Sequence, residues 1–267
     1  MARTRIDILL VERGLAPTRQ KAQAMLLAGA VLVDDRPVDK PGTLVSSEAA
    51  VRVRGNPIPY VSRGGLKLEH ALDRFGIDPT GLRVLDAGIS TGGFADCLLQ
   101  RGAAHIYGVD VGKAQVAWEI RQNPAVTLFE GTNVREFDVA RLGDPVDLVV
   151  ADLSFISLTL VLPVLHAALR PDGIALPMVK PQFEVGREHI GRKGVVRDET
   201  LRLAAVDKVV RASLECGFAH LGTTPSPVPG PEGNIEYFLH LRRAATSASP
   251  AVGGERGEPT CPRRTSS

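Results

Sequence analysis

The sequence predicts an α/β fold, an open and mostly parallel sheet flanked by helices, with a small α+β domain in front of it. From residue 82 onward, short apolar runs typical of strands alternate with helical patterns. Before residue 55, two short helical patterns are followed by strand-like runs. A length of 267 residues fits one large or two small domains, so both observations can hold together.

The composition is that of a globular protein. Hydrophobic residues make up 44% and charged residues 23%, which allows a sizeable core. Cys97, Cys216 and Cys261 form neither a metal-binding spacing nor a disulfide pattern, so we expect no metal and a reducing cytoplasm. No apolar stretch reaches the roughly 18 residues of a membrane span, and the N-terminus lacks a secretory signal. Because the net charge is only +2, affinity for nucleic acid must come from a local patch.

Residues 1–54 are expected to form the small domain. Apolar residues at helical spacing precede Gly14, which ends the first helix, and Thr18 is a plausible N-cap of the second. The expected elements are helices over residues 6–13 and 19–28, strands over 30–33 and 51–53, and a turn over 34–37.

Five basic residues face only two acidic ones within the first 29 positions. Such an excess on a two-helix unit indicates a surface that contacts phosphate, although a solvated helix face would give the same charge. The predicted RNA-binding residues are Arg3, Arg5, Arg13, Arg19 and Lys21.

Residues 55–62 contain glycine, asparagine and prolines, and are expected to form a short, fairly stiff linker. Residues 63–243 are expected to form the main domain. Residues 244–267 carry too few apolar side chains to order themselves and are expected to form a disordered tail. Within the main domain we expect helices from Gly64 and over 93–101, 158–169 and 199–216, and strands over 83–86, 105–110, 126–130, 146–152, up to Lys180, and 234–241.

Lys180 stands where an apolar run ends and a proline follows. Pro181 cannot donate to a sheet ladder, so the strand should stop there and leave Lys180 at the edge of the sheet. Open α/β sheets hold their ligands at the carboxyl ends of their strands. A solvated lysine at a strand end is the alternative, and the position alone does not exclude it.

A glycine-rich stretch between a predicted strand and a predicted helix suggests a cofactor site. The glycines allow close approach of a ligand, but their spacing, G-x-x-x-G-G from Gly88, differs from the dinucleotide pattern. The acidic Asp86 would repel a diphosphate and tolerate an ammonium or a sulfonium. Asp110, which ends the next strand, is placed to hydrogen-bond a ribose. These features favour S-adenosylmethionine over NAD, with another nucleotide or an empty scaffold as alternatives. The expected cofactor contacts are Asp86, Gly88, Ser90, Gly92, Gly93, Phe94, Asp110 and Asn133.

Four charged residues could form a catalytic group beside that loop: Lys67, Asp152, Lys180 and Glu236. The last three are expected to end three strands of one sheet, where they could meet. Each one alone is more readily explained as structural. Together they would suit methyl transfer to a sugar hydroxyl, with Lys180 as the base, Lys67 lowering its pKa, and two carboxylates orienting both amines.

These stretches resemble the TlyA family of ribosomal RNA 2′-O-methyltransferases, whose catalytic domain is of the FtsJ type. The resemblance covers roughly residues 5–240 and rests on residues 60–68, 86–94, 152–157, 179–184 and 233–237. It implies a Rossmann-like class I methyltransferase sheet behind an RNA-binding module of the ribosomal-protein S4 type. It also implies a catalytic tetrad of Lys67, Asp152, Lys180 and Glu236.

The substrate implied by the resemblance is a cytidine 2′-hydroxyl in ribosomal RNA of assembled subunits, the large one and conceivably the small one. Loss of the methyl group would give resistance to capreomycin-type antibiotics. No membrane and no obligate protein partner are expected. One departure concerns the linker: where actinobacterial members have Arg-x-Trp-Val, this chain has Ile58-Pro59-Tyr60-Val61.

Two other functions are alternatives for this sequence. The first is an RNA-binding assembly protein on an inactive methyltransferase scaffold, against which the intact tetrad argues. The second is a haemolysin, which lacks support because no membrane-active segment is found. Phe155 or Phe183 could support a base displaced from its stack, although a core position explains either aromatic as well.

Overall fold

The computed structural model describes residues 3–16, 18–27, 29–54, 58–186, 189–191, 194–230 and 232–244. The chain divides into two compact units, Met1–Arg63 and Gly64–Ser267, called the smaller and the larger unit below. Part of the predicted linker (residues 55–57) and nearly all of the predicted tail (residues 245–267) lie outside the described residues.

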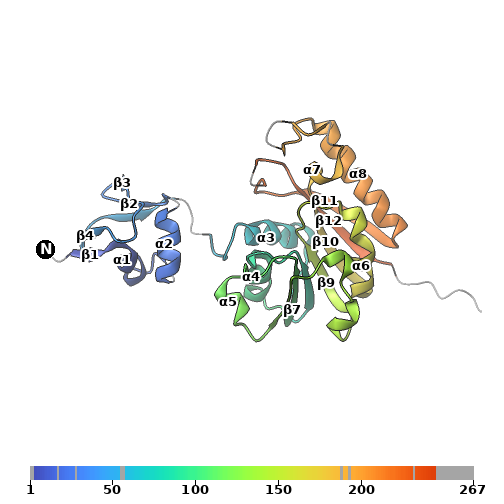
Figure 1. Ribbon diagram of the computed structural model, residues 1–267, viewed down its shortest axis with the longest axis horizontal. Coiled ribbons are helices and arrows are strands. Elements are labelled where there is room, and N and C mark those ends of the chain that lie inside the picture. The colour runs from blue at the N-terminus through green and yellow to red at the C-terminus, as the bar shows by residue number, and fades with distance from the viewer. Residues whose placement is uncertain are drawn as a thin grey trace, which may run out of the picture. The chain divides into compact units, whose positions relative to one another are not determined.

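The smaller unit is an α+β fold of two helices and two antiparallel sheets, as predicted (Figure 1). Both expected helices form, and Thr18 Oγ1 accepts the Lys21 N–H at 3.2 Å, which confirms it as an N-cap. The predicted turn over 34–37 is only partly right, because Arg36 and Pro37 pair with β2. The elements are β1 (Arg3–Arg5), α1 (Ile6–Glu12), α2 (Arg19–Leu27), β2 (Val31–Val33), β3 (Arg36–Pro37), β4 (Leu44–Ser46) and β5 (Val51–Val53).

A small core stabilises this unit. The inner faces of α1 and α2 bury Ile6, Leu10, Ala22 and Leu26 completely, and strand residues such as Val31 complete the cluster. Burial of each large aliphatic side chain contributes about 1.5–3 kcal/mol. Strands β1 and β4 were not predicted, because Arg3–Arg5 contains no apolar residue and Leu44–Ser46 contains only two adjacent ones, so neither shows a strand pattern.

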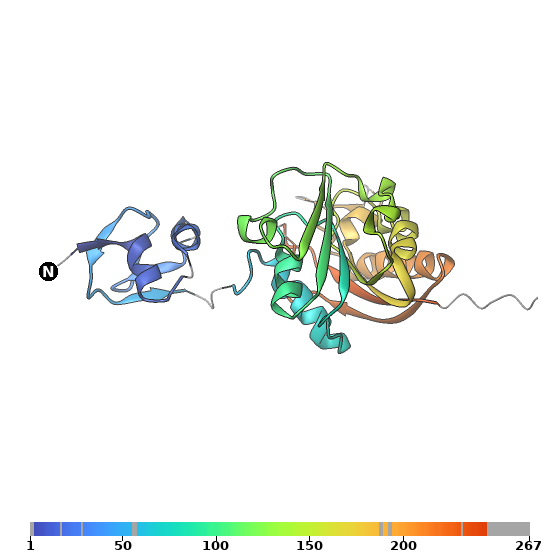
Figure 2. The ribbon, with the colours of Figure 1, turned by 90° about the horizontal axis from the view of Figure 1, so that it is seen from below.

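The larger unit contains one sheet of seven strands in the order β11-β12-β10-β9-β6-β7-β8. Figures 1 and 2 show this sheet from two directions, with helices packed beside it. The five strands from β10 to β8 are parallel, and β12 runs antiparallel to both its neighbours. This confirms the predicted Rossmann-like class. The strands are β6 (Arg83–Ala87), β7 (His105–Asp110), β8 (Val126–Glu130), β9 (Val146–Ala151), β10 (Leu169–Val179), β11 (Phe218–Pro225) and β12 (Tyr237–Arg243).

Helices cover both faces of this sheet, with α3 and α4 on one side and α6 and α8 on the other (Figure 1). The predicted helix over 158–169 is shorter than expected: a 3-10 turn precedes α6, and Leu169 already belongs to β10. The helices are α3 (Gly64–Phe75), α4 (Gly93–Gln100), α5 (Trp118–Arg121), α6 (Leu162–Ala168), α7 (Pro181–Glu184) and α8 (Glu199–Glu215), with 3-10 turns η1 (Val134–Glu136), η2 (Val139–Leu142) and η3 (Leu158–Leu160).

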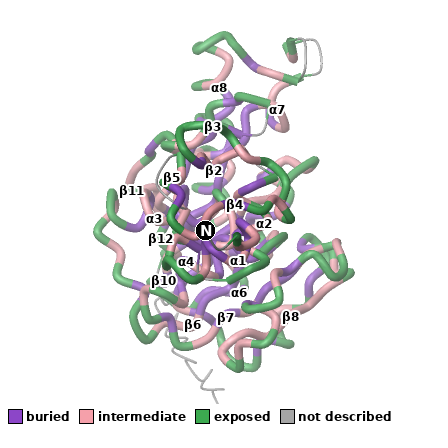
Figure 3. The backbone as a smooth tube through the Cα atoms, turned by 90° about the vertical axis from the view of Figure 1, so that its left-hand side faces the viewer, coloured by how far each residue is buried: buried purple, intermediate pink, exposed green. Residues whose placement is uncertain are grey.

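The central strands are buried on both faces, which explains their nearly continuous apolar sequences. Leu148, Val149, Val150 and Ala151 of β9 are all inaccessible to solvent. The buried parts of the chain appear purple in Figure 3. Such a sheet is rigid, so side chains placed just beyond its strand ends are held in defined positions.

Candidate active site

Lys180 lies one residue beyond the end of β10, as predicted. Pro181 takes the first position of α7 instead of extending the ladder. The Lys180 Nζ lies 2.6 Å from Asp152 Oδ1 and donates to Ser154 Oγ at 2.9 Å. Asp152 directly follows β9, and Pro177 of β10 pairs with Ala151 of β9 in parallel register. Lys180 and Asp152 therefore meet because neighbouring parallel strands end at the same edge.

Lys67 and Glu236 form a second ion pair, with 2.5 Å between Lys67 Nζ and Glu236 Oε2. The pair is almost completely buried, at 9% and 1% side-chain exposure. Lys67 comes from the first turns of α3, and its Nζ also lies 3.9 Å from Met178 Sδ on β10. Both ion pairs thus contact the end of one strand, β10.

One topological expectation for Glu236 was wrong. Glu236 does not end a strand; it precedes β12, which begins at Tyr237 and not at Asn234. It still reaches the site because β12 is antiparallel to β10, with Tyr237 paired to Val179. The amino end of β12 therefore lies at the same edge as the carboxyl end of β10.

A glycine makes room for the Glu236 carboxylate. A Cβ on Gly230 would lie 2.6 Å from Glu236 Oε1, closer than a non-bonded contact permits. Asn234 closes the same loop: its backbone oxygen accepts the Gly230 N–H at 2.9 Å, and its side-chain Oδ1 accepts the Val196 N–H at 3.0 Å. Gly230 and Asn234 therefore set the position of Glu236.

The glycine-rich loop after β6 lies directly against Asp152. Gly88 has a φ of 88°, and a Cβ there would approach Asp152 O to 2.7 Å. Gly92 has a φ of 94° and precedes the first turn of α4, which begins at Gly93. The Ser90 N–H donates to Asp110 Oδ2 at 2.8 Å, and the Gly112 N–H donates to Asp110 Oδ1 at 2.7 Å. Asp110 is thereby fixed at the end of β7 beside this loop.

Asp86 is fully buried, and neither of its carboxylate oxygens has a hydrogen-bond partner among the described residues. Its pKa is raised well above the usual range, first by burial and then by the charges of Asp152 and Asp110; the nearby Ala95 N–H lowers it only in part and does not reach hydrogen-bond geometry. A buried carboxylate without a donor fits a cationic ligand. Together with the open glycine backbone and Asp110, it suits the ammonium, sulfonium and ribose of S-adenosylmethionine.

Two other predicted cofactor contacts have structural partners. Phe94 is buried in α4, with its ring 5.9 Å from that of Phe238. Asn133 is exposed and caps η1, since its Oδ1 accepts the Arg135 N–H at 3.1 Å. A cofactor role for both remains a prediction.

The predicted RNA-binding cations are more constrained than their sequence suggested. Arg5 donates through two nitrogens to Asp7, and Arg19 donates through Nε to the same carboxylate at 2.9 Å. Arg13 donates to the backbone oxygens of Ser47 and Ala49, and Lys21 donates to that of Tyr60. Arg3 is exposed on β1.

Asp7 was not predicted to matter, because an acidic residue near a helix start is common. Its carboxylate is fully buried and accepts from Arg5, Arg19 and Gln23. The Arg5 hydrogen bonds chiefly, with those of Gln23 and Arg19, hold its pKa far below the usual range against the opposing effect of burial. Arg5 and Arg19 stay about half exposed, so one side of each guanidinium faces solvent.

Phe155 is 91% exposed, so its interpretation as a core aromatic is wrong. It lies between Ser154 and Ser157 with a φ of 64°, and its ring is 5.3 Å from that of the partly buried Phe183. Exposure of an aromatic ring in the segment that carries Asp152 makes it available to a ligand. Ser154 and Glu184, which also lie near Lys180, were missed because their types and spacing carry no distinctive signal.

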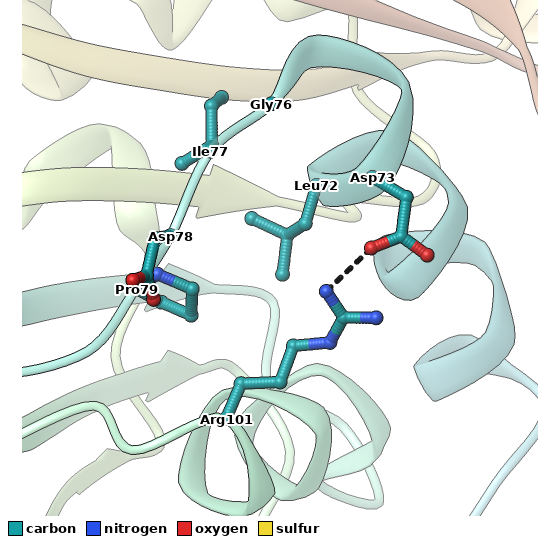
Figure 4. Close-up of a pocket in the computed structure, with 7 residues that line it drawn as sticks. All are labelled: Leu72, Asp73, Gly76, Ile77, Asp78, Pro79 and Arg101. Carbon is teal, nitrogen blue, oxygen red and sulfur yellow. Dashed lines mark hydrogen bonds and ion pairs between the residues drawn. The ribbon is translucent and has the colours of Figure 1, made fainter.

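A hollow of about 460 Å³ lies elsewhere on the larger unit (Figure 4). It is lined by the end of α3, residues 76–79 and Arg101, whose Nη1 is 2.6 Å from Asp73 Oδ1. These segments precede β6 and β7, so the hollow is at the edge where the parallel strands begin. None of the predicted site residues lines it.

The described residues contain no helix long and apolar enough to cross a membrane. Within the same part of the chain, no group of three or more metal-binding side chains could hold a metal ion.

Known proteins match both units. Residues 60–243 match the FtsJ-like methyltransferase family, and residues 4–51 match the S4 domain. The chain is 48% identical over 254 residues to the 16S/23S rRNA (cytidine-2′-O)-methyltransferase TlyA of Mycobacterium tuberculosis, with 95% of each chain covered. It is 36% identical over 238 residues to hemolysin A of Brachyspira hyodysenteriae, covering 89% of this chain and 99% of that one. A solved structure from Streptococcus thermophilus, named as a hemolysin, has a TM-score of 0.72 and 38% identity, covering 91% of this chain and 90% of the other.

The larger unit is thus an S-adenosylmethionine-dependent methyltransferase of the FtsJ-like type. The chain as a whole belongs to the TlyA family of ribosomal RNA methyltransferases, in which this domain follows an S4 domain.

Proposed function

We propose that the protein transfers a methyl group from S-adenosylmethionine to the 2′-hydroxyl of a cytidine in the ribosomal RNA of assembled subunits. The observation that carries this proposal is the pair of Lys–carboxylate contacts at the end of β10, against which the Asp86–Gly93 loop packs. The acceptor class is supported by the name of the M. tuberculosis relative. Only RNA offers a 2′-hydroxyl.

In this mechanism S-adenosylmethionine supplies an activated methyl group beside the tetrad. Asp86, Gly88 and Asp110 would hold the cofactor at the carboxyl edge of β6 and β7. Lys180 receives the proton of the 2′-hydroxyl as the oxygen–methyl bond forms and the sulfur–methyl bond breaks. Asp152 and Ser154 hold the Lys180 amine in one orientation, and orientation of this kind supplies much of the rate enhancement.

The second pair has a supporting role. Lys67 and Glu236 are paired and nearly buried, so together they add no net charge to the site. Lys67 lies against Met178 at the end of β10. We propose that the Lys67–Glu236 pair positions the acceptor ribose. As the general base, Lys180 would accept the 2′-hydroxyl proton on the free electron pair of its amine.

We further propose that the displaced cytidine stacks on Phe155. The ring is exposed and belongs to the segment that carries Asp152 and Ser154, and an exposed aromatic ring can stack on an unstacked base. Taking a base out of its stack costs a few kcal/mol, which stacking on an aromatic ring would offset in part.

The division of labour follows the two units. Residues 1–54 would supply affinity for RNA through Arg3, Arg5, Arg13, Arg19 and Lys21. Residues 55–62 would link the two domains, and residues 63–243 would carry out the methyl transfer. The enzyme would act in the cytoplasm on the large subunit, and label on the small subunit would extend its substrates to both. Cells lacking it would then be less susceptible to capreomycin-type antibiotics.

The test uses the full chain, tritiated S-adenosylmethionine and unmethylated large or small subunits. Wild type should label RNA, and Lys180→Ala should lose at least about 100-fold in rate, as expected on removing a general base. Arg74→Ala is the control, an exposed cation at the far end of α3. Failure of the wild type to label either subunit, despite binding both RNA and cofactor, would favour the non-catalytic assembly protein.

A further inference from the structure

Lys180 and its two partners lie on two segments that are not part of the sheet. Asp152 and Ser154 belong to the segment between β9 and η3, and Lys180 lies between β10 and α7. The distances of 2.6 and 2.9 Å at Lys180 Nζ therefore depend on how these two segments are held against each other.

A buried carboxylate, that of Glu184, joins them. Glu184 is the last residue of α7, and its side chain is only 1% exposed. Its Oε2 accepts from Ser157 Oγ at 2.6 Å, and its Oε1 accepts the Leu158 N–H at 2.7 Å. Lys208 of α8 donates to Glu184 Oε2 at 3.2 Å and to its backbone oxygen at 2.8 Å.

These contacts fix both sides of the Lys180 ion pair. Ser157 is three residues after Ser154, and Glu184 is four residues after Lys180. The Glu184 carboxylate closes a loop that contains Lys180, Asp152 and Ser154. Hydrogen bonds to a buried carboxylate are short and strong, so the two segments can move little relative to each other. Lys208, by contrast, is half exposed and contributes from outside this loop.

We propose that Glu184 is a positioning residue for methyl transfer: its carboxylate ties the Asp152–Ser157 segment to α7 and thereby sets Lys180 against Asp152 and Ser154. The proposal rests on the function proposed above. A misplacement of about 1 Å at a reacting group can cost about 100-fold in rate, which sets the size of the expected effect.

The first variant is Glu184→Gln, which keeps the shape but replaces one acceptor oxygen with an amide that cannot accept. We expect kcat to fall by about 10- to 100-fold, while Kd values for S-adenosylmethionine and for ribosomal subunits change less than twofold. The matched control is Lys208→Met, which leaves the Ser157 and Leu158 contacts intact and should keep kcat within about threefold of wild type. Equal loss of kcat and of both affinities would indicate general unfolding and would overturn the proposal.

A double variant separates positioning from plain structural support. If Glu184 acts through Ser154 and Lys180, Glu184→Gln and Ser154→Ala together should lose less than the product of their separate losses in kcat. The pH at which kcat reaches its plateau should also shift in Glu184→Gln, because the surroundings of Lys180 change. A purely structural defect would leave both the pH profile and the additivity unchanged.

Nuclear magnetic resonance of ¹⁵N-labelled lysine gives a readout that needs no substrate. In wild type the Lys180 Nζ protons should be protected by Asp152 and Ser154, and Glu184→Gln should lose that protection. If wild type transfers no methyl group yet shows this dependence, the proposed function fails and the positioning role stands. If the Lys180 signal is unchanged in Glu184→Gln, the positioning role is wrong. Ser157→Ala, with a smaller expected loss, serves if Glu184→Gln does not fold.

Discussion

Two aspartates in this protein are equally buried and are held in opposite states. Asp7, in the smaller unit, accepts from Arg5, Arg19 and Gln23, and its pKa lies far below the usual range. Asp86, in the larger unit, has no hydrogen-bond partner among the described residues, and burial raises its pKa well above that range.

Burial alone therefore does not reveal what a carboxylate does; the donors around it do. Asp7 is satisfied by its own chain, so it serves the fold and the placement of two arginines. Asp86, near the end of β6 and beside the glycine-rich loop, has no hydrogen-bonded donor among the described residues, which costs stability unless a ligand supplies the missing charge. A site can thus be recognised where the fold leaves a polar group unsatisfied.

The largest effect is expected for Asp86→Asn. Affinity for S-adenosylmethionine should fall by about 100-fold, since a hydrogen bond to a charged group contributes about 1.5–3 kcal/mol. Thermal stability of the free protein should not fall, because a poorly solvated carboxylate has been removed. Isothermal titration and a thermal melt measure the two quantities. The exposed Asp207→Asn is the control, and unchanged cofactor affinity in Asp86→Asn would refute the assignment.

Asp7→Asn should show the reverse pattern. Loss of the charge that holds Arg5 and Arg19 should lower the free energy of unfolding by about 2 kcal/mol, a value discounted because both arginines are half exposed. Affinity for S-adenosylmethionine should not change. Denaturant titration tests the first point, with the exposed Asp39→Asn as control. A variant as stable as wild type would show that the three donors do not depend on this carboxylate.

The pH dependence of the two aspartates should also differ in sign. The pKa of Asp86 is raised by folding, so its neutral form stabilises the protein at low pH, and that contribution is lost as pH rises through the raised pKa. The pKa of Asp7 is lowered by folding, so its contribution is present above the ordinary aspartate pKa and is lost as pH falls towards the lowered value.

The affinity for S-adenosylmethionine should depend on pH through the protonation of Asp86. Where Asp86 is protonated in the free protein, binding of a cation releases that proton, and affinity should rise by up to about tenfold per pH unit. Isothermal titration in buffers of different ionisation enthalpy measures the number of protons released on cofactor binding. Affinity independent of pH in wild type would contradict the expectation, as would an identical slope in Asp86→Asn.

The smallest effects are expected for single arginines of the smaller unit. Arg19→Gln and Arg3→Gln should each weaken subunit binding by about three- to tenfold and reduce the salt dependence, because each removes one phosphate contact. Filter binding at several salt concentrations gives both numbers. Cofactor affinity should stay constant, and its parallel loss would argue against the division of labour between the two units.

Much of this architecture could be predicted from the sequence. The apolar run before Pro181 and the glycines after Asp86 placed Lys180 and the cofactor loop at strand ends, and both positions are confirmed. The full sets of partners around Asp7 and Glu184 could not be predicted, since Arg19 and Gln23 lie 12 and 16 residues from Asp7, and Ser157 lies 27 residues from Glu184. Glu236 was assigned to the wrong end of its strand, because strand direction depends on pairing and not on local composition. The exposure of Phe155 was equally hidden, since an aromatic residue next to a strand end usually packs into the core.

The most direct test of the central claim is to locate the methyl group itself. Subunit RNA labelled by the wild-type enzyme is hydrolysed with alkali, which spares the phosphodiester next to a 2′-O-methylated ribose. The account predicts a labelled, alkali-resistant dinucleotide that begins with cytidine, at least about 100-fold less of it with Lys180→Ala, and a normal yield with Arg74→Ala. Label on a base, or undiminished label with Lys180→Ala, would contradict it.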